Sequence, residues 1–343
     1  MINKKATINK KSTINKKSTR QYTALICLFF LMGALLLGCG ASDNQTANRN
    51  TTAPAAGSAA STKTLETAST CAYTDYKGHT VNIPRAPGRI AYFGENYGDL
   101  LVLGVQAVGT STSMIEGKVY EKQVQNVSDL GFPIDLEKAL ALQPDLIITS
   151  NTDEMQYTAL TKIAPTIMFD TFAPINERLL LLGDIVNKKK AAEDWLAQYK
   201  IKEAEMWTKL HENGVKAGET ASVFTYYPGD RLFVMGRTGL SQILYEKNGV
   251  KPTAPIQKVL DEDKGFVQIS QEVIGQYAGD RIFILSTPSS EAQQSTEQLM
   301  KSKLWLQLPA VKQGHVYIQD IGKTESDAST REWLLKELPK LIK

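Results

Sequence analysis

The chain has 343 residues, 42% of them hydrophobic, and its 39 Lys and Arg against 36 Asp and Glu give a formal net charge of +3. Seven basic residues and no acidic ones lie within the first 20 positions, so the remainder, with 32 basic and 36 acidic residues, is mildly acidic and gives no indication of nucleic-acid binding. Three cysteines and three histidines are too few for a disulfide framework or for a zinc-type site.

A basic leader precedes an apolar segment at the N-terminus. The hexapeptide Ile-Asn-Lys-Lys-Ala/Ser-Thr occurs three times from Ile2, and residues 22–37 are almost wholly apolar. This segment is short for a membrane span and has the length of a signal-peptide core. It ends at Leu36-Leu37-Gly38-Cys39, which resembles a bacterial lipobox. The pattern predicts a signal peptide over residues 1–38 and a palmitoylated lipid anchor on Cys39 at the extracytoplasmic face of the cell membrane. The alternative is an ordinary signal peptide with a chance cysteine.

Residues 39–70 are predicted to form a flexible tether. They are mainly Ala, Ser, Thr, Asn and Gly, with too few apolar side chains to build a core. If Cys27 leaves with the signal peptide and Cys39 is acylated, Cys71 has no partner. We therefore expect a fold without disulfides.

An N-terminal lobe is predicted over residues 71–172. A hairpin is expected first, with strands over residues 71–75 and 80–83. A strand over residues 89–93, a helix over 97–103 and a strand over 104–109 follow. Strand and helix alternate, which indicates an α/β fold.

An internal repeat indicates a second, similar lobe. Residues 135–150 and 270–286 share one pattern, in which a capping Asp or Ser opens a short helix and an apolar strand ends at Ser. Each segment also contains a Glu near its start, Glu137 or Glu272, and an Asp eight residues after that Glu. A strand over residues 221–226 and a helix over 239–245 also echo the first lobe, with a hairpin inserted around residues 228–230. The second lobe, with a C-terminal helix, is therefore predicted over residues 217–343.

A helical connector is predicted between the lobes, over residues 173–216. Apolar residues recur there at near-helical spacing, and a break is expected near Asn187. Such a connector favours a rigid two-lobed body with the ligand cleft between the lobes.

Several motifs, in this order and spacing, resemble the ferric-siderophore and cobalamin-binding lipoproteins that serve ABC importers. They are Pro84–Ile90, Leu136–Ala139 with Pro144–Ile148, Leu182–Ile185, Tyr277–Asp280 and Leu304–Tyr317. The resemblance extends from about Pro84 to Ile342. It implies two Rossmann-like lobes bridged by a long helix, in a monomeric protein that is not an enzyme. It also implies that the protein captures an iron–siderophore chelate and delivers it to a permease dimer with a cytoplasmic ATPase. Haem or cobalamin as the ligand, or a membrane-anchored enzyme, are the alternatives.

The same resemblance implies that Glu137 and Glu272 dock with arginines of the permease dimer, one from each lobe. A Glu in the first turn of a helix also stabilises the helix dipole, which is the alternative interpretation. Recurrence in both repeats favours docking, because a two-fold pair of carboxylates suits a two-fold partner.

Ligand-binding residues are expected where strand ends and the following loops face the cleft. The candidates in the first lobe are Glu95, Asn96, Tyr97, Ser111, Thr112, Ser113 and Thr152. Those in the second lobe are Thr225, Tyr227, Arg237, Thr287, Ser289 and Lys323. Arg237 is the strongest candidate, because it follows a predicted strand at the point where the family often carries a ligand-facing basic residue.

The ligand is expected to be a ferric hydroxamate or a mixed carboxylate chelate. The sequence shows no cluster of Lys and Arg like the one that catecholate-binding relatives use. Direct metal binding would need several His or Cys ligands, and only His79, His211 and His315 are present. Haem is an alternative with Tyr227 or Met235 as the iron ligand. The sequence has no Gly-x-Ser-x-Gly or phosphate-loop motif, and no covalent group besides the lipid is expected.

Overall fold

The computed structural model describes residues 69–124, 126–150 and 152–342. All of them belong to one compact unit, Thr64–Lys343. The predicted signal peptide, Cys39 and nearly all of the tether lie outside the described residues. No helix in the described ranges combines the length and the apolar composition that crossing a bilayer requires.

A two-stranded hairpin opens the described chain, as predicted. β1 (Thr70–Thr74) pairs antiparallel with β2 (Thr80–Pro84). Asp75 holds the turn, because one of its carboxylate oxygens accepts hydrogen bonds from two backbone N–H groups of the turn at 2.9 and 3.0 Å. The other oxygen accepts the N–H of Met168 at 2.9 Å. The hairpin is thereby fastened to the lobe that follows it.

The first lobe is built on a five-stranded parallel sheet in the order β5–β4–β3–β6–β7. Its strands are β3 (Ile90–Phe93), β4 (Gly109–Thr110), β5 (Ser128–Asp129), β6 (Leu146–Thr149) and β7 (Thr166–Met168). The helical segments around it are α1 (Tyr97–Val102), α2 (Leu136–Ala141) and α3 (Glu154–Leu160), with short 3-10 turns at η1 (Thr112–Met114) and η2 (Glu121–Gln123). Strands β3, β6 and β7 are buried on both faces, which explains their continuous apolar sequences.

One predicted strand of this lobe is shorter than expected. The strand expected over residues 104–109 forms only at its end, as β4. Gly104 has a φ of +70° and still belongs to the turn that ends α1, since its N–H donates to the carbonyl oxygen of Leu101.

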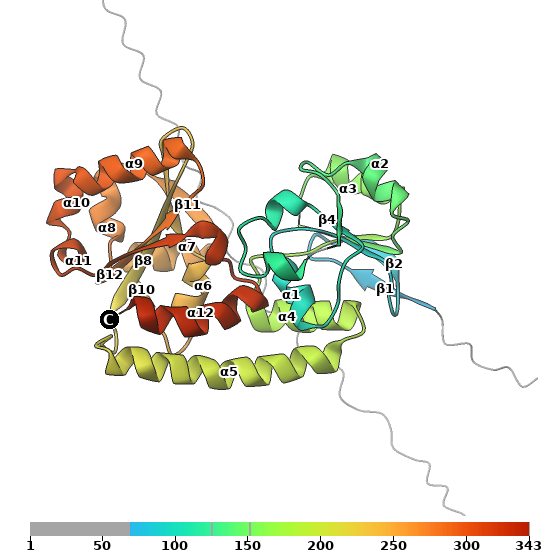
Figure 1. Ribbon diagram of the computed structural model, residues 1–343, viewed down its shortest axis with the longest axis horizontal. Coiled ribbons are helices and arrows are strands. Elements are labelled where there is room, and N and C mark those ends of the chain that lie inside the picture. The colour runs from blue at the N-terminus through green and yellow to red at the C-terminus, as the bar shows by residue number, and fades with distance from the viewer. Residues whose placement is uncertain (1–68, 125, 151, 343) are drawn as a thin grey trace, which may run out of the picture. The chain divides into compact units, whose positions relative to one another are not determined.

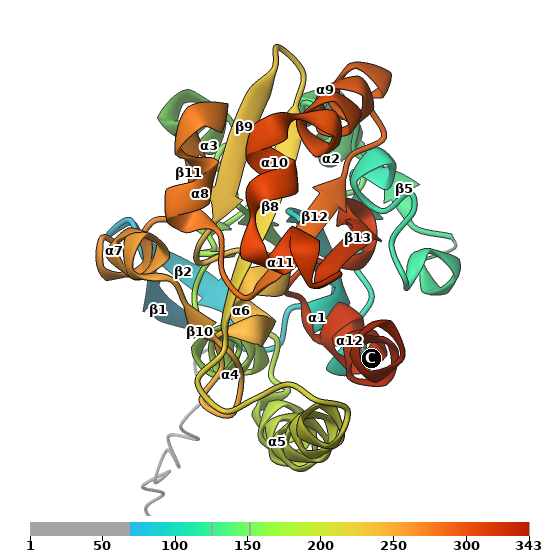
Figure 2. The same ribbon diagram turned by 90° about the vertical axis from the view of Figure 1, so that its left-hand side faces the viewer.

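The second lobe has a mixed sheet in the order β11–β9–β8–β12–β13, with β10 paired to the start of β8. Its strands are β8 (Thr220–Tyr227), β9 (Arg231–Met235), β10 (Lys251–Pro252), β11 (Phe266–Ile269), β12 (Arg281–Ser286) and β13 (Val316–Asp320). Strands β8, β10, β12 and β13 are parallel, whereas β9 is antiparallel to both β8 and β11. Figure 2 shows β8 and β9 as one long hairpin, which is the predicted insertion around residues 228–230.

Short helices connect these strands. They are α6 (Leu240–Leu244), α7 (Ala254–Asp261), α8 (Ile274–Tyr277), α9 (Ser290–Lys301), α10 (Lys303–Gln307) and α11 (Pro309–Lys312), with 3-10 turns at η3 (Gln271–Val273) and η4 (Ile321–Lys323). The C-terminal helix is α12 (Ala328–Leu341).

Two helices form the connector between the lobes (Figure 1). α4 (Ile175–Ile185) and α5 (Lys189–Glu212) are separated by the predicted break, where Asn187 has a φ of +55°. The beginning of α5 packs into the core of the first lobe through Ala192, and its later turns pack into the core of the second lobe through Trp207. The predicted architecture, two Rossmann-like α/β lobes bridged by a long helix, is confirmed.

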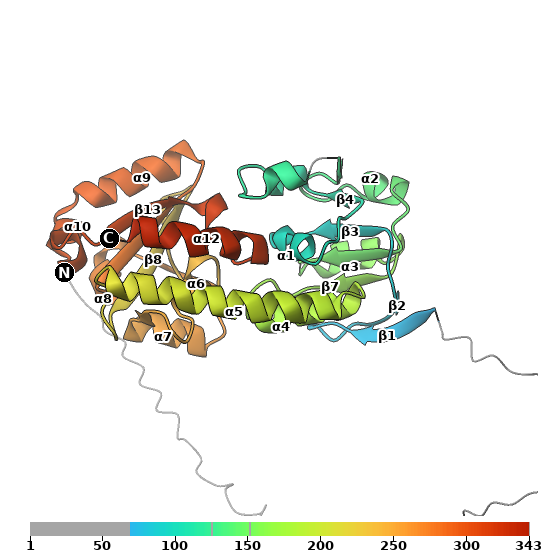
Figure 3. The same ribbon diagram turned by 60° about the horizontal axis from the view of Figure 1, so that its bottom comes forward.

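A buried ion pair ties three segments together where the lobes meet. Arg178 of α4 and Asp99 of α1 are fully buried, with Nε 2.6 Å from Oδ2. Arg178 also donates to the carbonyl oxygens of Thr171 and Ser326 at 3.1 and 2.7 Å. The N–H of Ala328 donates to Asp99 at 2.7 Å. The start of α12 is thereby joined to α1, and Figure 3 shows the two helices meeting end to end. These contacts favour the rigid two-lobed body.

The aspartates of the internal repeat hold equivalent strands. Asp145 accepts hydrogen bonds from the N–H groups of Gly88 and Arg89 at 2.7 and 3.0 Å, just before β3. Asp280 accepts the N–H and the hydroxyl of Thr220, both at 2.8 Å, at the start of β8. Each aspartate therefore clamps the first strand of its own lobe's sheet.

The residues that open the two repeats behave differently. Asp135 caps α2, because its carboxylate accepts the N–H groups of Glu137 and Lys138 at 2.9 and 3.2 Å. Ser270 makes no such cap, and its hydroxyl binds the Glu272 carboxylate instead. The predicted capping role is therefore confirmed for Asp135 and wrong for Ser270.

Candidate functional site

Four aromatic side chains form a continuous series at the junction of the second-lobe sheet and the segment that precedes α4; we call it the aromatic row. Phe172 comes from that segment, Phe266 from β11, Phe233 from β9 and Tyr227 from β8. Successive rings meet edge to face, with centroids 6.3, 5.5 and 5.5 Å apart. All four residues keep part of their surface exposed. The aromatic row therefore offers an apolar wall to a ligand.

Arg231 lies beside this row. Side chains alternate between the two faces of a strand, so Arg231 and Phe233 share one face of β9. The guanidinium carbon lies 5.9 Å from the centroid of the Phe233 ring, a cation–π contact, and Nε donates to the carbonyl oxygen of Pro228 at 2.8 Å. None of the carboxylates in the described ranges forms an ion pair with it. Arg231 is therefore a cation that a ligand could use.

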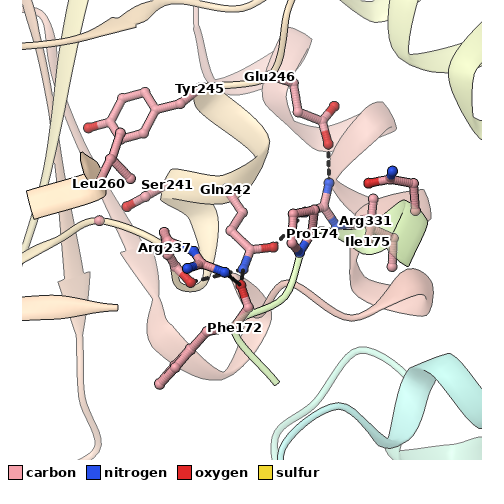
Figure 4. Close-up of a pocket in the computed structure, with 12 residues that line it drawn as sticks. Phe172, Pro174, Ile175, Arg237, Ser241, Gln242, Tyr245, Glu246, Leu260 and Arg331 are labelled. Atoms are coloured by element: carbon pink, nitrogen blue, oxygen red, sulfur yellow. Dashed lines mark hydrogen bonds and ion pairs between the residues drawn. The ribbon is translucent and has the colours of Figure 1, made fainter. Parts of the chain in front are cut away.

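Arg237, the strongest candidate from the sequence, is held by protein partners. Its guanidinium lies 2.6 Å from the Asp263 carboxylate and donates to the carbonyl oxygen of Phe172 at 3.3 Å. Gln242 donates to the same oxygen at 3.0 Å, and Figure 4 shows both side chains converging on Phe172. This geometry favours an anchoring role for Arg237 over the predicted ligand contact.

A cavity of about 290 Å³ adjoins this anchor. Its walls come from residues 172–176, from the region around α6 and from α12 (Figure 4). Arg331 and Glu246 of the cavity wall form an ion pair with each other. The Arg331 guanidinium also donates a hydrogen bond to the side-chain oxygen of Gln242 at 3.0 Å. We therefore regard this cavity as part of the lobe junction.

Charged residues of both lobes meet across the cleft. Lys118 of the first lobe pairs with Glu325 of the second, with Nζ 2.6 Å from Oε1 and both side chains largely buried. The side chain of Glu95 is accessible at the surface, but the surrounding protein atoms reduce its hydration. This loss of hydration, and then repulsion from Glu325, raise the pKa of Glu95 to about 7, while Lys118 opposes the shift. Burial, followed by the charges of Glu325 and Glu95, raises the pKa of Tyr227 on the opposite lobe. Tyr227 therefore links the aromatic row to these charged residues, and we take the region between them as the candidate ligand cleft.

Three predicted residues of the first lobe are buried. Asn96 packs against the guanidinium of Arg178. The Tyr97 hydroxyl accepts a backbone N–H at 3.0 Å within the core. Ser111 is buried with its Oγ 3.1 Å from the Oγ of Ser113, which is exposed. The three buried side chains support the loops that border the cleft and do not form its surface.

The other predicted polar residues also include both buried and exposed side chains. Thr225 and Thr287 are buried, and their hydroxyls donate to backbone carbonyl oxygens at 2.8 and 3.4 Å. Ser289 caps α9. The residues that stay exposed are Thr112, Thr152 and Lys323, of which Thr112 binds Asp129 through its hydroxyl at 2.9 Å. Tyr227 is the predicted residue that lies in the aromatic row.

Several residues of this cleft were not predicted from the sequence. They are Lys118, Phe172, Arg231, Phe233, Phe266 and Glu325. The alternation Arg231-Leu232-Phe233 could have indicated the second-lobe wall, because it places a cation and an aromatic ring on one face of a strand. Nothing in the local sequence indicates that Lys118 and Glu325, more than 200 positions apart, form a pair.

Glu137 and Glu272 are both exposed, and each lies near the start of a helical segment in its own lobe. The hydroxyl of Ser270 lowers the pKa of Glu272, so this carboxylate is charged at neutral pH. Glu272 also lines a polar groove of about 660 Å³ together with Asp230, Gln268 and Gln271. The two acids thus have the exposure that docking requires.

Comparison with known proteins agrees with this architecture. A family model described as "Periplasmic binding protein" matches residues 90–320. The Bacillus subtilis protein "Iron(3+)-hydroxamate-binding protein YxeB" is 32% identical over 72% of this chain and 77% of its own length. "Iron(3+)-hydroxamate-binding protein FhuD" of the same organism is 30% identical over 88% and 92%. The solved structure of "The FhuD protein from S.pseudintermedius" superposes with a TM-score of 0.70 at 26% identity, covering 79% of this chain and 97% of that one. The chain therefore belongs to the periplasmic binding protein family.

Proposed function

We propose that this protein binds a ferric hydroxamate chelate between its lobes and delivers it to an ABC permease. The observation that carries the proposal is the aromatic row with one unpaired guanidinium, Arg231, beside it. A ferric trihydroxamate has an uncharged metal core with apolar arms, which suits aromatic faces and needs few counter-charges. The names of the two Bacillus subtilis relatives support the same ligand class.

The charges of the cleft disfavour catecholate chelates of iron, which are trianionic. Lys118 is engaged by Glu325, and Arg237 is engaged by Asp263. Glu95 adds a further negative charge on the first lobe when it is ionised. A trianionic ligand would therefore meet repulsion from carboxylates and too few free cations.

Haem and cobalamin are less well supported as ligands. Met235, one of the two proposed haem ligands, is buried in the hydrophobic core of the second lobe. The other, Tyr227, is occupied in an edge-to-face contact with Phe233. These contacts favour a ligand that arrives with its iron already coordinated.

Delivery is the second part of the proposal. Glu137 and Glu272 present one exposed carboxylate on each lobe, and a permease dimer would offer arginines with two-fold symmetry. A lipid on Cys39 would hold the protein beside that permease. The exposure of both acids and their recurrence in the two repeats support this step.

The ligand proposal is tested by equilibrium dialysis of the full-length protein, purified in detergent, against a panel of ligands labelled on their metal, which is cobalt for cobalamin and iron for the others. The panel comprises ferric trihydroxamates, a ferric tricatecholate, a ferric carboxylate chelate, haem and cobalamin. Trihydroxamates should saturate at one per chain and bind most tightly. Phe233→Ala should weaken them roughly tenfold or more, because a central aromatic contact is lost.

The matched control is Phe132→Ala, which removes an exposed phenylalanine that stacks on Phe93 of the first lobe, outside the aromatic row. It should leave the affinity unchanged. Failure of every trihydroxamate to bind would overturn the proposed ligand class. An equal loss in both variants would remove the aromatic row from the site.

A further inference from the structure

The carboxylate of Glu95 is unpaired within the cleft. Glu95 follows the carboxyl end of β3 and is exposed, whereas the next two residues, Asn96 and Tyr97, are buried. No side-chain hydrogen bond or ion pair joins this carboxylate to another described residue. The Tyr120 hydroxyl donates, at 3.4 Å, to the backbone carbonyl oxygen of Glu95 and leaves its side chain free.

The charged groups that surround Glu95 leave a surplus of negative charge. Lys118 is the cation that acts on Glu95, and its ammonium is already paired with Glu325 at 2.6 Å. From the second lobe, Tyr227 lies near enough for the charges of both carboxylates to raise its pKa, in addition to the larger effect of burial. Arg231, which also acts on Tyr227, is directed to the Phe233 ring and to the carbonyl oxygen of Pro228. Glu95 therefore lacks a counter-ion of its own.

We propose that Glu95 is a specificity-determining residue that makes the cleft prefer chelates carrying a protonated amine over neutral chelates with the same iron core. This inference rests on the proposed function. The uncharged iron core would lie against the aromatic row, and a pendant ammonium would reach across to the first lobe. It would pair with Glu95 without displacing Lys118 from Glu325. A ligand that fills the cleft also excludes water, which strengthens this pairing.

The same arrangement makes the preference depend on pH. Reduced hydration among the surrounding protein atoms, and then the Glu325 charge, raise the pKa of Glu95 to about 7, so about half of the molecules carry a proton there at pH 7. An ammonium requires the ionised carboxylate and therefore expels this proton when it binds. The fraction of ionised Glu95 falls about tenfold between pH 8 and pH 6, so most of the preference for the cationic chelate should be lost over this range.

The experiment compares ferrioxamine B, a ferric trihydroxamate with one pendant amine, with the same chelate acetylated on that amine. Affinities are measured at pH 6, 7 and 8 with the full-length protein in detergent, and proton release is followed by calorimetry in two buffers of different ionisation enthalpy. At pH 8 the amine form should bind several-fold more tightly than the acetylated form. Its affinity should fall toward that of the acetylated form by pH 6, with proton release near pH 7.

In Glu95→Gln the two chelates should bind within about twofold of each other at every pH, with no proton release. The matched control is Glu193→Gln on α5, an exposed glutamate whose replacement should leave both the preference and its pH dependence as in the wild type. A wild-type protein without the preference, or a preference that survives in Glu95→Gln, overturns the inference while binding of both chelates still supports the proposed function. Absence of binding of either chelate to the wild type overturns the proposed function and this inference with it.

Discussion

In the first lobe five parallel strands follow one another from β3 to β7, whereas in the second lobe the same succession is interrupted after β8 by the antiparallel strand β9. Both lobes keep an aspartate that clamps the first strand, Asp145 or Asp280. The inserted strand carries Arg231 and Phe233. The repeat thus builds the scaffold, and β9, which has no counterpart in the first lobe, supplies much of the proposed ligand wall.

The largest expected effect concerns Glu137 and Glu272, the exposed acids that recur in both lobes. If docking uses both lobes, replacing Glu137 and Glu272 together by Arg should lower uptake of iron-labelled chelate by cells at least tenfold, through like-charge repulsion with the permease. The chelate Kd of the purified variant should stay within about twofold, because both residues lie outside the aromatic row. Each single variant should lose part of the uptake, which tests whether the lobes contribute equally.

The control for docking makes the same Glu-to-Arg replacement at two other exposed glutamates. Glu193 and Glu205 are exposed on α5, and replacing both by Arg should leave uptake normal at equal expression. Normal uptake by the double Arg variant of Glu137 and Glu272 would contradict docking and leave only their effect on helix dipoles.

An intermediate effect is expected from the two clamps. Asp145→Ala and Asp280→Ala each remove the acceptor for two donors, so each should lower the free energy of unfolding by about 1–3 kcal/mol in urea titrations. The Asn variants retain one acceptor oxygen and should lose less. Similar losses in both lobes would support equivalent clamps, and a loss confined to one lobe would show that the repeat is not equivalent in stability.

Acidification gives the Asp280 clamp a second test. Hydrogen bonds from Thr220 hold the pKa of Asp280 below its ordinary value, although partial burial opposes the shift. A carboxylate whose pKa is lowered on folding stabilises the protein above its unfolded pKa, and this stabilisation is lost as the pH falls through the lowered value. The difference between the wild type and Asp280→Ala should therefore shrink below pH 4.

The scaffold could be predicted from the sequence, because its signals are local. Buried strands such as β6 read as apolar runs, and the repeat made the two lobes visible through Glu137, Glu272 and their aspartates. The break at Asn187 followed from the interruption of helical spacing. These features depend on neighbours within about fifteen positions and need no knowledge of tertiary contacts.

The cleft could be predicted only in part, because its contacts are distant in the sequence. Phe172, Phe233 and Phe266 each look like ordinary core residues, and the row exists only once three segments come together. Its position after β9 makes Arg237 the stronger candidate in the sequence, yet its partner Asp263 lies 26 positions further on. Arg231 is the first residue of the same strand, and no carboxylate of the described residues forms an ion pair with it. Which of two similar arginines is free is decided by tertiary structure.

The smallest expected effect concerns the β1–β2 hairpin, which the first lobe carries and the second lobe lacks. His79 lies at its turn, with Nδ1 3.0 Å from Asp75, Nε2 3.1 Å from Glu154, and its ring stacked on Tyr157 at 4.0 Å. The hydrogen bond to Asp75 is the main cause that raises the pKa of His79, with a smaller contribution from Glu154. The protonated imidazolium therefore binds the hairpin to α3.

Because the pKa of His79 is higher in the folded protein than in the unfolded chain, this stabilisation is fully present below about pH 6.5 and is lost as the pH rises through the raised value. Hydrogen exchange, corrected for intrinsic rates, should show protection of the β1–β2 amides falling a few-fold between pH 6 and pH 9. In His79→Gln this dependence should vanish, and the amides of the β8–β9 hairpin provide the internal reference. An equal pH dependence in both hairpins would show that His79 does not control the attachment of the first one, since β8–β9 has no histidine at its turn.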